Sequence, residues 1–307
     1  MSDRWDVLGL GVAAVDDLFY VERFPRPNTK TPIQAQERQG GGLTGTALVA
    51  AARLGVRAAY LGILGDDPLS RFALESLESE GVDCTPVLRH PDARPVYAVV
   101  IVDRSSGERT IFYTTAGYMP VPSERIEAQL IQRCRVLFVD YTAGEGGLYA
   151  TMLAHRFGIP VVADIEREQA PAVAELISQV DHLIVDVEIA ARLSGETQPP
   201  SMVRALARRE RACCVVTAGE KGCWYAEWGG EVHHFPAYRV EVVDTTGCGD
   251  VFHGAYAACI ARGEPVARAI QVASATAALK ATQPGGRSGI PTWSVVEAFL
   301  NTAAHVP

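Results

Sequence analysis

Short apolar runs alternate with segments of helical periodicity, regularly from about residue 44 onward. The helical segments include 44–54, 68–80 and 145–157. The candidate buried strands between them are Val7–Val12, Ala58–Leu64, Val136–Val139, Pro160–Ala163, His182–Val185 and Cys213–Thr217. This alternation predicts an α/β fold with a doubly wound, mainly parallel sheet flanked by helices.

Two regions interrupt the alternation, residues 15–38 and residues 95–114. In the second region the apolar runs Tyr97–Val102 and Thr110–Tyr113 flank a polar turn, which is the pattern of a hairpin. We therefore expect the two regions to form a small, separate antiparallel sheet. The sequence contains no repeat, low-complexity tract or flexible linker, so we expect residues 1–307 to form one domain.

The composition favours a compact protein that acts on small molecules. The chain has 307 residues, of which 48% are apolar and 21% charged, enough to bury a full core. Its net charge of -8 argues against a nucleic-acid partner, because nucleic-acid binders usually carry a basic surface. Seven cysteines, an odd number without a CxxC pair, argue against a disulfide framework and a zinc ribbon.

The first residues are polar and lack the apolar region of a signal peptide. No stretch of transmembrane length is free of charges, so we expect no membrane partner. Together with the cysteine pattern, this predicts a cytoplasmic location.

The most informative feature is the run 244–250, Asp-Thr-Thr-Gly-Cys-Gly-Asp, because an apolar helical segment follows it at once. Glycines let backbone N–H groups turn inward, and the helix dipole adds its positive end, so a phosphoryl group would meet several fixed donors. A carboxylate there suits the acceptance of a proton from an attacking hydroxyl. The alternative is that Asp250 only caps the helix, since aspartate is a favoured N-cap residue.

This run resembles the second signature of the ribokinase-like (PfkB) carbohydrate kinases. The resemblance implies that Asp250 is the catalytic base and that the amides of Gly247, Cys248 and Gly249 form an anion hole. It also implies that ATP with Mg²⁺ is the phosphoryl donor and that a sugar is the acceptor. In this family the small sheet, here about residues 15–38 and 95–114, is a lid that often pairs with a second subunit, which favours a homodimer.

Two segments resemble the parts of the family that bind the sugar. Asp16 lies at the position where the family has an acid that binds sugar hydroxyls, and Asp17 is a less favoured candidate. The alternative is that either residue is only a solvated charge in a loop. The run 40–47 resembles the first glycine signature, in which Gly41 and Gly42 approach the sugar. Thr46 replaces the usual asparagine, and a hydroxyl supplies only part of the hydrogen-bonding set of a carboxamide. We therefore expect the acceptor to be held differently from ribose in ribokinase.

Two other segments resemble the parts of the family that bind the nucleotide. Thr217, Gly219 and Gly222 follow a strand in the TxGxxG pattern that approaches the ATP phosphates. Thr246 belongs to the signature run, and Gly285 lies in a loop that resembles the one closing over adenine. Glycine turns after strands are common, so the TxGxxG pattern alone is weak evidence for a nucleotide site. Its position ahead of the signature run is what supports this interpretation.

Cation sites are the least determined part of the resemblance. Where the family often has Asn-x-x-Glu for Mg²⁺, this chain offers Asp186 and Glu188, and a solvated acid pair is an equal alternative. Carbonyls around Asp244 and the 284–291 loop are candidates for a monovalent cation such as K⁺, although carbonyl coordination leaves no residue signature.

The acceptor is open at this stage. The chain shares local runs such as PGGRSGIP, and a lysine at position 30, with the sulfofructose kinases of this family. The other two residues by which those proteins recognise sulfonate are replaced here by Thr142 and Tyr113. Lys30 still favours an anionic substituent, because an ammonium is a strongly hydrated point charge. The alternatives are a nucleoside kinase of the same fold and a non-catalytic sugar-binding regulatory protein. A dehydrogenase is disfavoured, because the GxGxxA run at 9–14 continues as an extended segment.

Overall fold

The computed structural model describes residues 4–106, 108–168, 170–209 and 211–305. Its main sheet has the strand order β14-β13-β12-β11-β10-β9-β1-β4. The strands are β1 (Trp5–Leu10), β4 (Ala58–Leu61), β9 (Cys134–Asp140), β10 (Val161–Asp164), β11 (His182–Asp186), β12 (Cys213–Thr217), β13 (Cys223–Glu227) and β14 (His233–Phe235). Pairing is parallel from β4 to β12 and antiparallel for β12-β13-β14. The predicted, mainly parallel sheet is confirmed.

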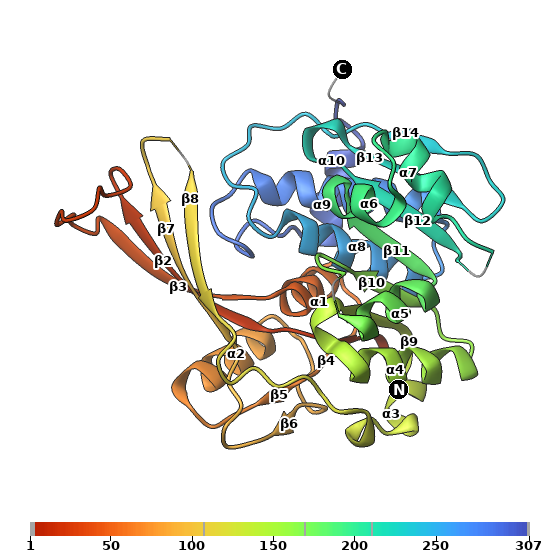
Figure 1. The fold of residues 1–307 in the computed structure, drawn as a ribbon. Helices are drawn as coiled ribbons and strands as arrows, with labels where there is room; N and C mark the ends of the chain where they lie inside the picture. Colours follow the sequence, from red (N-terminus) through yellow and green to blue (C-terminus); the bar gives the residue numbers. More distant parts are fainter. Residues whose placement is uncertain (1–3, 107, 169, 210, 306–307) are drawn as a thin grey trace.

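Helices cover both faces of the main sheet (Figure 1). The helices α1, α2, α8, α9 and α10 contribute to one apolar core, and α3 to α7 contribute to the other. Their bounds are α1 (Leu43–Arg53), α2 (Pro68–Ser79), α3 (Ala128–Gln132), α4 (Gly144–Arg156), α5 (Pro171–Gln179), α6 (Val187–Ser194), α7 (Pro199–Leu206), α8 (Cys248–Ala261), α9 (Val266–Ala281) and α10 (Trp293–Leu300). Because both faces are covered, the central strands are apolar on both sides, which explains their continuous apolar runs.

The predicted strand 58–64 is divided in two. It forms β4 and the short β5 (Ile63–Leu64), which pairs with β6 (Leu88–Arg89) outside the main sheet. The run 9–14 leads from β1 into a strand and not into a helix, so the dinucleotide-binding alternative is excluded. Within the described ranges, no helix has both the length and the apolar character needed to cross a membrane.

A separate small sheet projects from one side of the main body (Figure 1). It has the order β3-β2-β7-β8 and consists of β2 (Ala14–Val21), β3 (Ala35–Gly41), β7 (Val96–Asp103) and β8 (Arg109–Thr114). The β2-β3 and β7-β8 pairs are antiparallel, but β2 and β7 are parallel. The expectation of a purely antiparallel sheet is therefore wrong at its centre. Both central strands leave the main body in the same direction, so they meet side by side as parallel strands.

Candidate active site

Two cavities border the run 244–250. The first, which we call the apolar cavity, has a volume of about 600 Å³ and lies between the end of β12, the loop 237–245 and helices α8 and α9. The second, the inter-sheet cavity, has a volume of about 390 Å³ and lies between the small sheet and the loops 243–246 and 284–286. Thr245, Cys248 and Gly249 line the apolar cavity, whereas Asp244 and Thr246 line the inter-sheet cavity. The run thus separates the two cavities.

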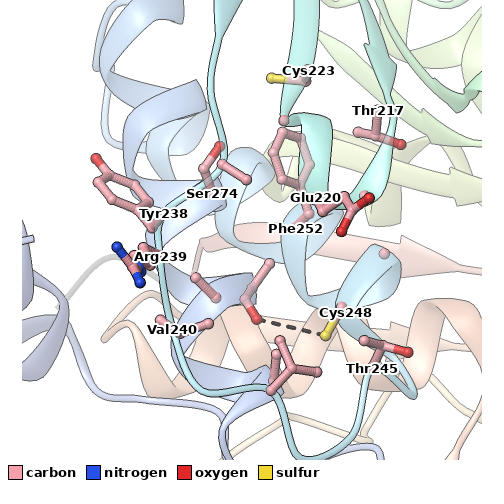
Figure 2. A pocket seen from close by; sticks show the side chains of 18 residues that line it. Thr217, Glu220, Cys223, Tyr238, Arg239, Val240, Thr245, Cys248, Phe252 and Ser274 are labelled. Carbon is pink, nitrogen blue, oxygen red and sulfur yellow. Dashed lines mark hydrogen bonds between the residues drawn. The ribbon is translucent and has the colours of Figure 1, made fainter. Parts of the chain in front are cut away.

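Small side chains of α9 form one wall of the apolar cavity. They are Ser274, Ala277, Ala278 and Ala281, and this spacing places them on one helix face. The Cys248 thiol donates to the carbonyl oxygen of Ala277 over 3.6 Å, and Phe252 lines the same cavity (Figure 2). A smooth apolar wall with few polar groups suits a flat, largely apolar ring.

Five residues are predicted to bind the nucleotide. The structure places three of them at one cavity and the other two away from it. Thr217, Gly219 and Gly222 line the apolar cavity. Thr246 lines the inter-sheet cavity instead, and so do both neighbours of Gly285. The Gly285 N–H donates to a carboxylate oxygen of Asp244 over 2.8 Å, so the loop carrying Gly285 folds toward the inter-sheet side. This loop therefore borders the inter-sheet cavity and not the apolar cavity, and its predicted closure over adenine stays a prediction.

Helix α8 begins with unpaired backbone donors. Its N-cap is Gly247, with a φ of 71°, and no side chain caps the helix. The backbone N–H groups of Gly247, Gly249 and Asp250 have no acceptor among the described residues. That of Cys248 donates to the Thr245 carbonyl oxygen over 3.2 Å, so the predicted anion hole is wrong at Cys248. Unpaired donors at the positive end of a helix favour a bound anion. Asp250 lies in the first turn and not at the N-cap, so the capping alternative is wrong.

The two glycines of the turn have different roles. A Cβ atom on Gly247 would lie 2.9 Å from the carbonyl oxygen of Gly286, and the positive φ itself disfavours a side chain. Gly249 is helical without a positive φ, and a Cβ there would meet open space. Only Gly247 is therefore required by the backbone turn, while Gly249 borders the volume that a ligand would occupy.

Asp250 is half-buried, and several charged groups lie within electrostatic reach of its carboxylate. Desolvation, and then the carboxylates of Asp164 and Glu166, raise the pKa of Asp250 well above its ordinary value. His253 and Arg287 act in the opposite direction. A carboxylate with a raised pKa binds a proton more readily, which suits a general base.

His253 has a structural position beneath this turn. Its Nδ1 atom is 2.7 Å from the carbonyl oxygen of Gly249, and its Nε2 atom is 3.1 Å from that of Ile184. The ring is buried, and Nδ1 is also 3.4 Å from Asp164 Oδ2, which has no hydrogen-bond partner among the described residues. His253 therefore fixes the first turn of α8. Asp164 escaped the sequence reasoning, although its position at the carboxyl end of β10 was a usable signal.

Asp16 is the acid of β2 that faces the inter-sheet cavity. Its carboxylate lies over Gly41, where a Cβ atom would collide with it. Burial raises the pKa of Asp16 to about 6, and Arg287 partly opposes the shift. Asp17 forms an ion pair with Arg38, with a closest separation of 2.7 Å. Asp16 and not Asp17 therefore faces this cavity, and its role as the acid that binds the acceptor stays a prediction.

Arg287 is a buried cation that the sequence analysis did not single out. Its guanidinium donates to the Gly41 carbonyl oxygen over 2.7 Å and to the hydroxyls of Thr46 and Ser76, each over 3.2 Å. Desolvation lowers the pKa of Arg287 to about 10, and the carboxylates of Asp16 and Asp250 are among the groups that oppose this shift. Arg287 therefore lies within electrostatic reach of both acids.

Two predicted acceptor residues have other positions. Thr46 lines neither cavity, and its hydroxyl oxygen accepts a hydrogen bond from Arg287. Lys30, which is predicted to bind an anionic substituent of the acceptor, is exposed in the loop between β2 and β3 and also lines neither cavity. The cations that border the inter-sheet cavity are Arg104 and Arg109, and Arg109 lies 3.5 Å from Asp244. Gly42 holds the turn before α1 with a φ of 85°.

The candidate cation ligands fit poorly. Asp186 caps α6 by accepting from the Ile189 N–H over 2.7 Å, and Glu188 is exposed. Within the described residues, no three His, Cys, Asp or Glu side chains are placed to hold a metal ion. The carboxylate of Asp244 already accepts hydrogen bonds from the N–H and hydroxyl groups of Thr246 and from the N–H of Gly285.

The carbonyl oxygen of Asp244 already has a cationic partner. It accepts from the ammonium of Lys280 over 2.9 Å, and Lys280 is fully buried. Desolvation lowers the pKa of Lys280, and Cys248 and Asp244 oppose that shift. The Asp244 carbonyl oxygen, one of the candidate ligands for K⁺, is therefore already paired with an ammonium and does not fit a potassium site.

The main sheet is doubly wound, and the small sheet lies beside the start of α8, where the unpaired N–H groups and Asp250 are found. This combination defines a ribokinase-like α/β protein. The sequence profile of the pfkB family carbohydrate kinase matches residues 6–293. The chain belongs to this family of carbohydrate kinases.

Named relatives agree with this assignment. The chain is 27% identical to ribokinase of Schizosaccharomyces pombe over 279 residues, covering 85% of this chain and 86% of that protein. It is 26% identical to deoxyribokinase of Salmonella typhi, covering 96% of this chain and 99% of that protein. A solved chain from Agrobacterium tumefaciens, provisionally named a ribokinase, is 30% identical with a TM-score of 0.88, covering 96% and 97%. Arabidopsis thaliana ribokinase in complex with ribose and ATP shares the fold, with a TM-score of 0.83 at 21% identity, covering 97% and 99%.

Proposed function

We propose that this kinase transfers the γ-phosphoryl group of ATP to a hydroxyl of a sugar or sugar derivative, with Asp250 as the general base. The observation that carries the proposal is the position of the run 244–250 between two cavities, with unpaired N–H groups beside a carboxylate. The apolar cavity would hold the adenine, and the inter-sheet cavity would hold the acceptor. A phosphoryl group in transfer would then meet the start of α8.

Each residue has a separate task in this proposal. Asp250 takes the proton of the attacking hydroxyl, and the N–H groups of Gly247, Gly249 and Asp250 stabilise charge on the γ-phosphoryl group. Asp16 accepts hydrogen bonds from the acceptor. Mg²⁺ bound to ATP would neutralise phosphate charge; it usually keeps several waters and needs few protein carboxylates. Asp186 and Glu188 do not form a site for it by themselves.

One observation favours a second candidate, a nucleoside kinase. The small sheet contributes Leu18, Tyr20, Val100 and Val102 to the inter-sheet cavity, and such a surface could also contact a base. An ADP-release assay over ketoses, aldoses, sugar acids and nucleosides separates the two. Phosphorylation of nucleosides alone would replace the sugar proposal, and ATP hydrolysis indifferent to every acceptor would contradict both.

The affinity for the acceptor should depend on the ionisation of Asp16. Its pKa of about 6 means that the carboxyl is ionised at pH 7.5 and mostly protonated at pH 5. Because the ionised form accepts hydrogen bonds from hydroxyls, we expect acceptor affinity to fall about 10-fold between these pH values. Titration calorimetry without ATP measures this directly. Asp16→Asn should bind weakly with no such pH dependence; an unchanged pH dependence in that variant would assign the titration to another group.

We also propose that the small sheet pairs with its counterpart in a second copy of the chain. Strand β8 is an edge strand, and its Ile111, Phe112 and Tyr113 are 48%, 56% and 56% exposed. Exposed apolar edges are surfaces for association. Sedimentation velocity should show a dimer that Phe112→Asp dissociates, and a monomeric unsubstituted protein at tens of micromolar would contradict the pairing.

A further inference from the structure

Gln39 is a polar residue of the inter-sheet cavity that the proposed mechanism does not use. It lies on β3 directly opposite Asp16 on β2, and both side chains line the cavity. Opposed residues of an antiparallel pair project from the same face with their Cβ atoms about 5 Å apart. Gln39 is only 9% exposed. The amide and the carboxylate are therefore neighbours, and the amide is largely buried.

The orientation of the Gln39 amide is fixed by a neighbouring loop. Its Oε1 atom accepts a hydrogen bond from the Gly286 N–H over 3.0 Å, and an N–H can pair only with the oxygen end of an amide. Gly285 lets this loop approach, since a Cβ atom there would collide with the amide. The position of the oxygen end determines where the nitrogen end lies.

The Nε2 atom of Gln39 is buried and has no acceptor among the described residues. Buried donors are nearly always satisfied in folded proteins, and an unsatisfied one is unfavourable. A ligand oxygen would satisfy it. Asp16 offers the complementary group, because an ionised carboxylate only accepts hydrogen bonds.

We propose that Gln39 selects the sugar acceptor by donating a hydrogen bond from its Nε2 atom to one oxygen of that sugar. This oxygen is on the carbon next to the one whose hydroxyl Asp16 binds. The inference rests on the proposed function, in that the inter-sheet cavity holds the acceptor. It requires oxygens on neighbouring carbons of the acceptor. The first is a hydroxyl that donates to Asp16; the second is a hydroxyl, carbonyl or carboxylate oxygen that accepts from Gln39. An acceptor lacking the second oxygen leaves the amide unpaired and is rejected.

The test compares acceptors that differ by one oxygen. The probes are D-ribose with 2-deoxy-D-ribose and D-glucose with 2-deoxy-D-glucose, each measured as kcat/KM. The unsubstituted protein should prefer the oxygenated member of at least one pair by about 10- to 100-fold. Gln39→Met should lower kcat/KM for that member by a similar factor and leave the deoxy member within about 3-fold. The matched control is Gln36→Met, because Gln36 lies on the same strand, is exposed and does not line the cavity.

Several results would overturn the inference. The first is that the unsubstituted protein prefers the oxygenated sugar in neither pair. The second is that Gln39→Met lowers kcat/KM equally for the oxygenated sugar and its deoxy analogue. A third is an equal effect of Gln36→Met. If Gln39→Met does not fold, side-chain amide NMR of the unsubstituted protein decides: one glutamine NH₂ pair, assigned by its loss in Gln39→Glu, should shift with the preferred sugar and not with its deoxy analogue.

Failure of the kinase proposal is recognised separately. If no probe is phosphorylated, calorimetry of the same sugars without ATP still tests Gln39. Selective binding of an oxygenated sugar that Gln39→Met abolishes would support the role of Gln39 while the phosphotransfer proposal falls. Absence of binding by all four sugars would overturn the inference.

Discussion

The Asp250→Asn variant is expected to bind ATP and the acceptor almost as well as the unsubstituted protein but to lose about 10²- to 10⁴-fold in kcat. An asparagine side chain keeps the shape of aspartate but cannot accept the proton of the attacking hydroxyl. Steady-state ADP release gives kcat, and calorimetry gives the two affinities. Because Asp250 does not cap α8, the substitution removes no helix cap and should leave the melting temperature nearly unchanged.

Asp186→Asn is the matched control for this prediction. Asp186 is also an acid at the start of a helix, but it is exposed and caps α6, a role that asparagine fills equally well. Its kcat should stay within about 3-fold, and a large loss would show that Asp186 acts on Mg²⁺ or phosphate after all. If Asp250→Asn retained kcat within a few-fold on the preferred acceptor, Asp250 would not be the base.

The surroundings of Asp250 also explain why its protonation should matter above the pH range in which an ordinary aspartate titrates. Desolvation and the carboxylates of Asp164 and Glu166 raise its pKa, and only the ionised form can take a proton. The catalytic rate should therefore rise with pH over a range above the ordinary range for aspartate. Arg287 opposes the shift and reaches Asp16 as well, so one buried guanidinium stabilises the ionised forms of both acids.

The main sheet could be predicted because each central strand is a short apolar run that needs no information from distant residues. The small sheet was predicted only in part. Its two hairpin-like pairs are local in character, whereas the parallel contact of β2 with β7 depends on how both leave the main body. No pattern within either region encodes that contact.

The site shows the same division between local and distant information. Asp16, Gly247 and Asp250 belong to short runs whose backbone shape is largely local. Arg287 and Gln39 acquire their positions through contacts between segments about 240 residues apart in sequence, such as the hydrogen bond from Gly286 to Gln39. Lys30 illustrates the same point, since a loop cation gives no indication in the sequence of whether it faces a cavity.

The second large effect is expected from Gly247→Val, which should lower kcat by about 10²- to 10³-fold, as expected for displacing anion-hole donors. Gly247 has a φ of 71°, where a β-branched residue is a strong outlier, and its added Cβ would press on the carbonyl oxygen of Gly286. The N–H groups at the start of α8 would then move away from the phosphoryl group. Acceptor affinity, measured by calorimetry without ATP, should change much less than kcat.

Gly263→Val separates this effect from simple backbone strain. Gly263 follows the other end of α8 with a φ of 78°, and a Cβ atom there would meet nothing within 4 Å. It should lower the free energy of unfolding by about 1–2 kcal/mol, the cost of a left-handed residue, and keep kcat within about 3-fold. Thermal or urea unfolding measures the first quantity and ADP release the second. Comparable losses of kcat in both variants would mean that strain in α8, and not displacement of the donors at its start, lowers turnover.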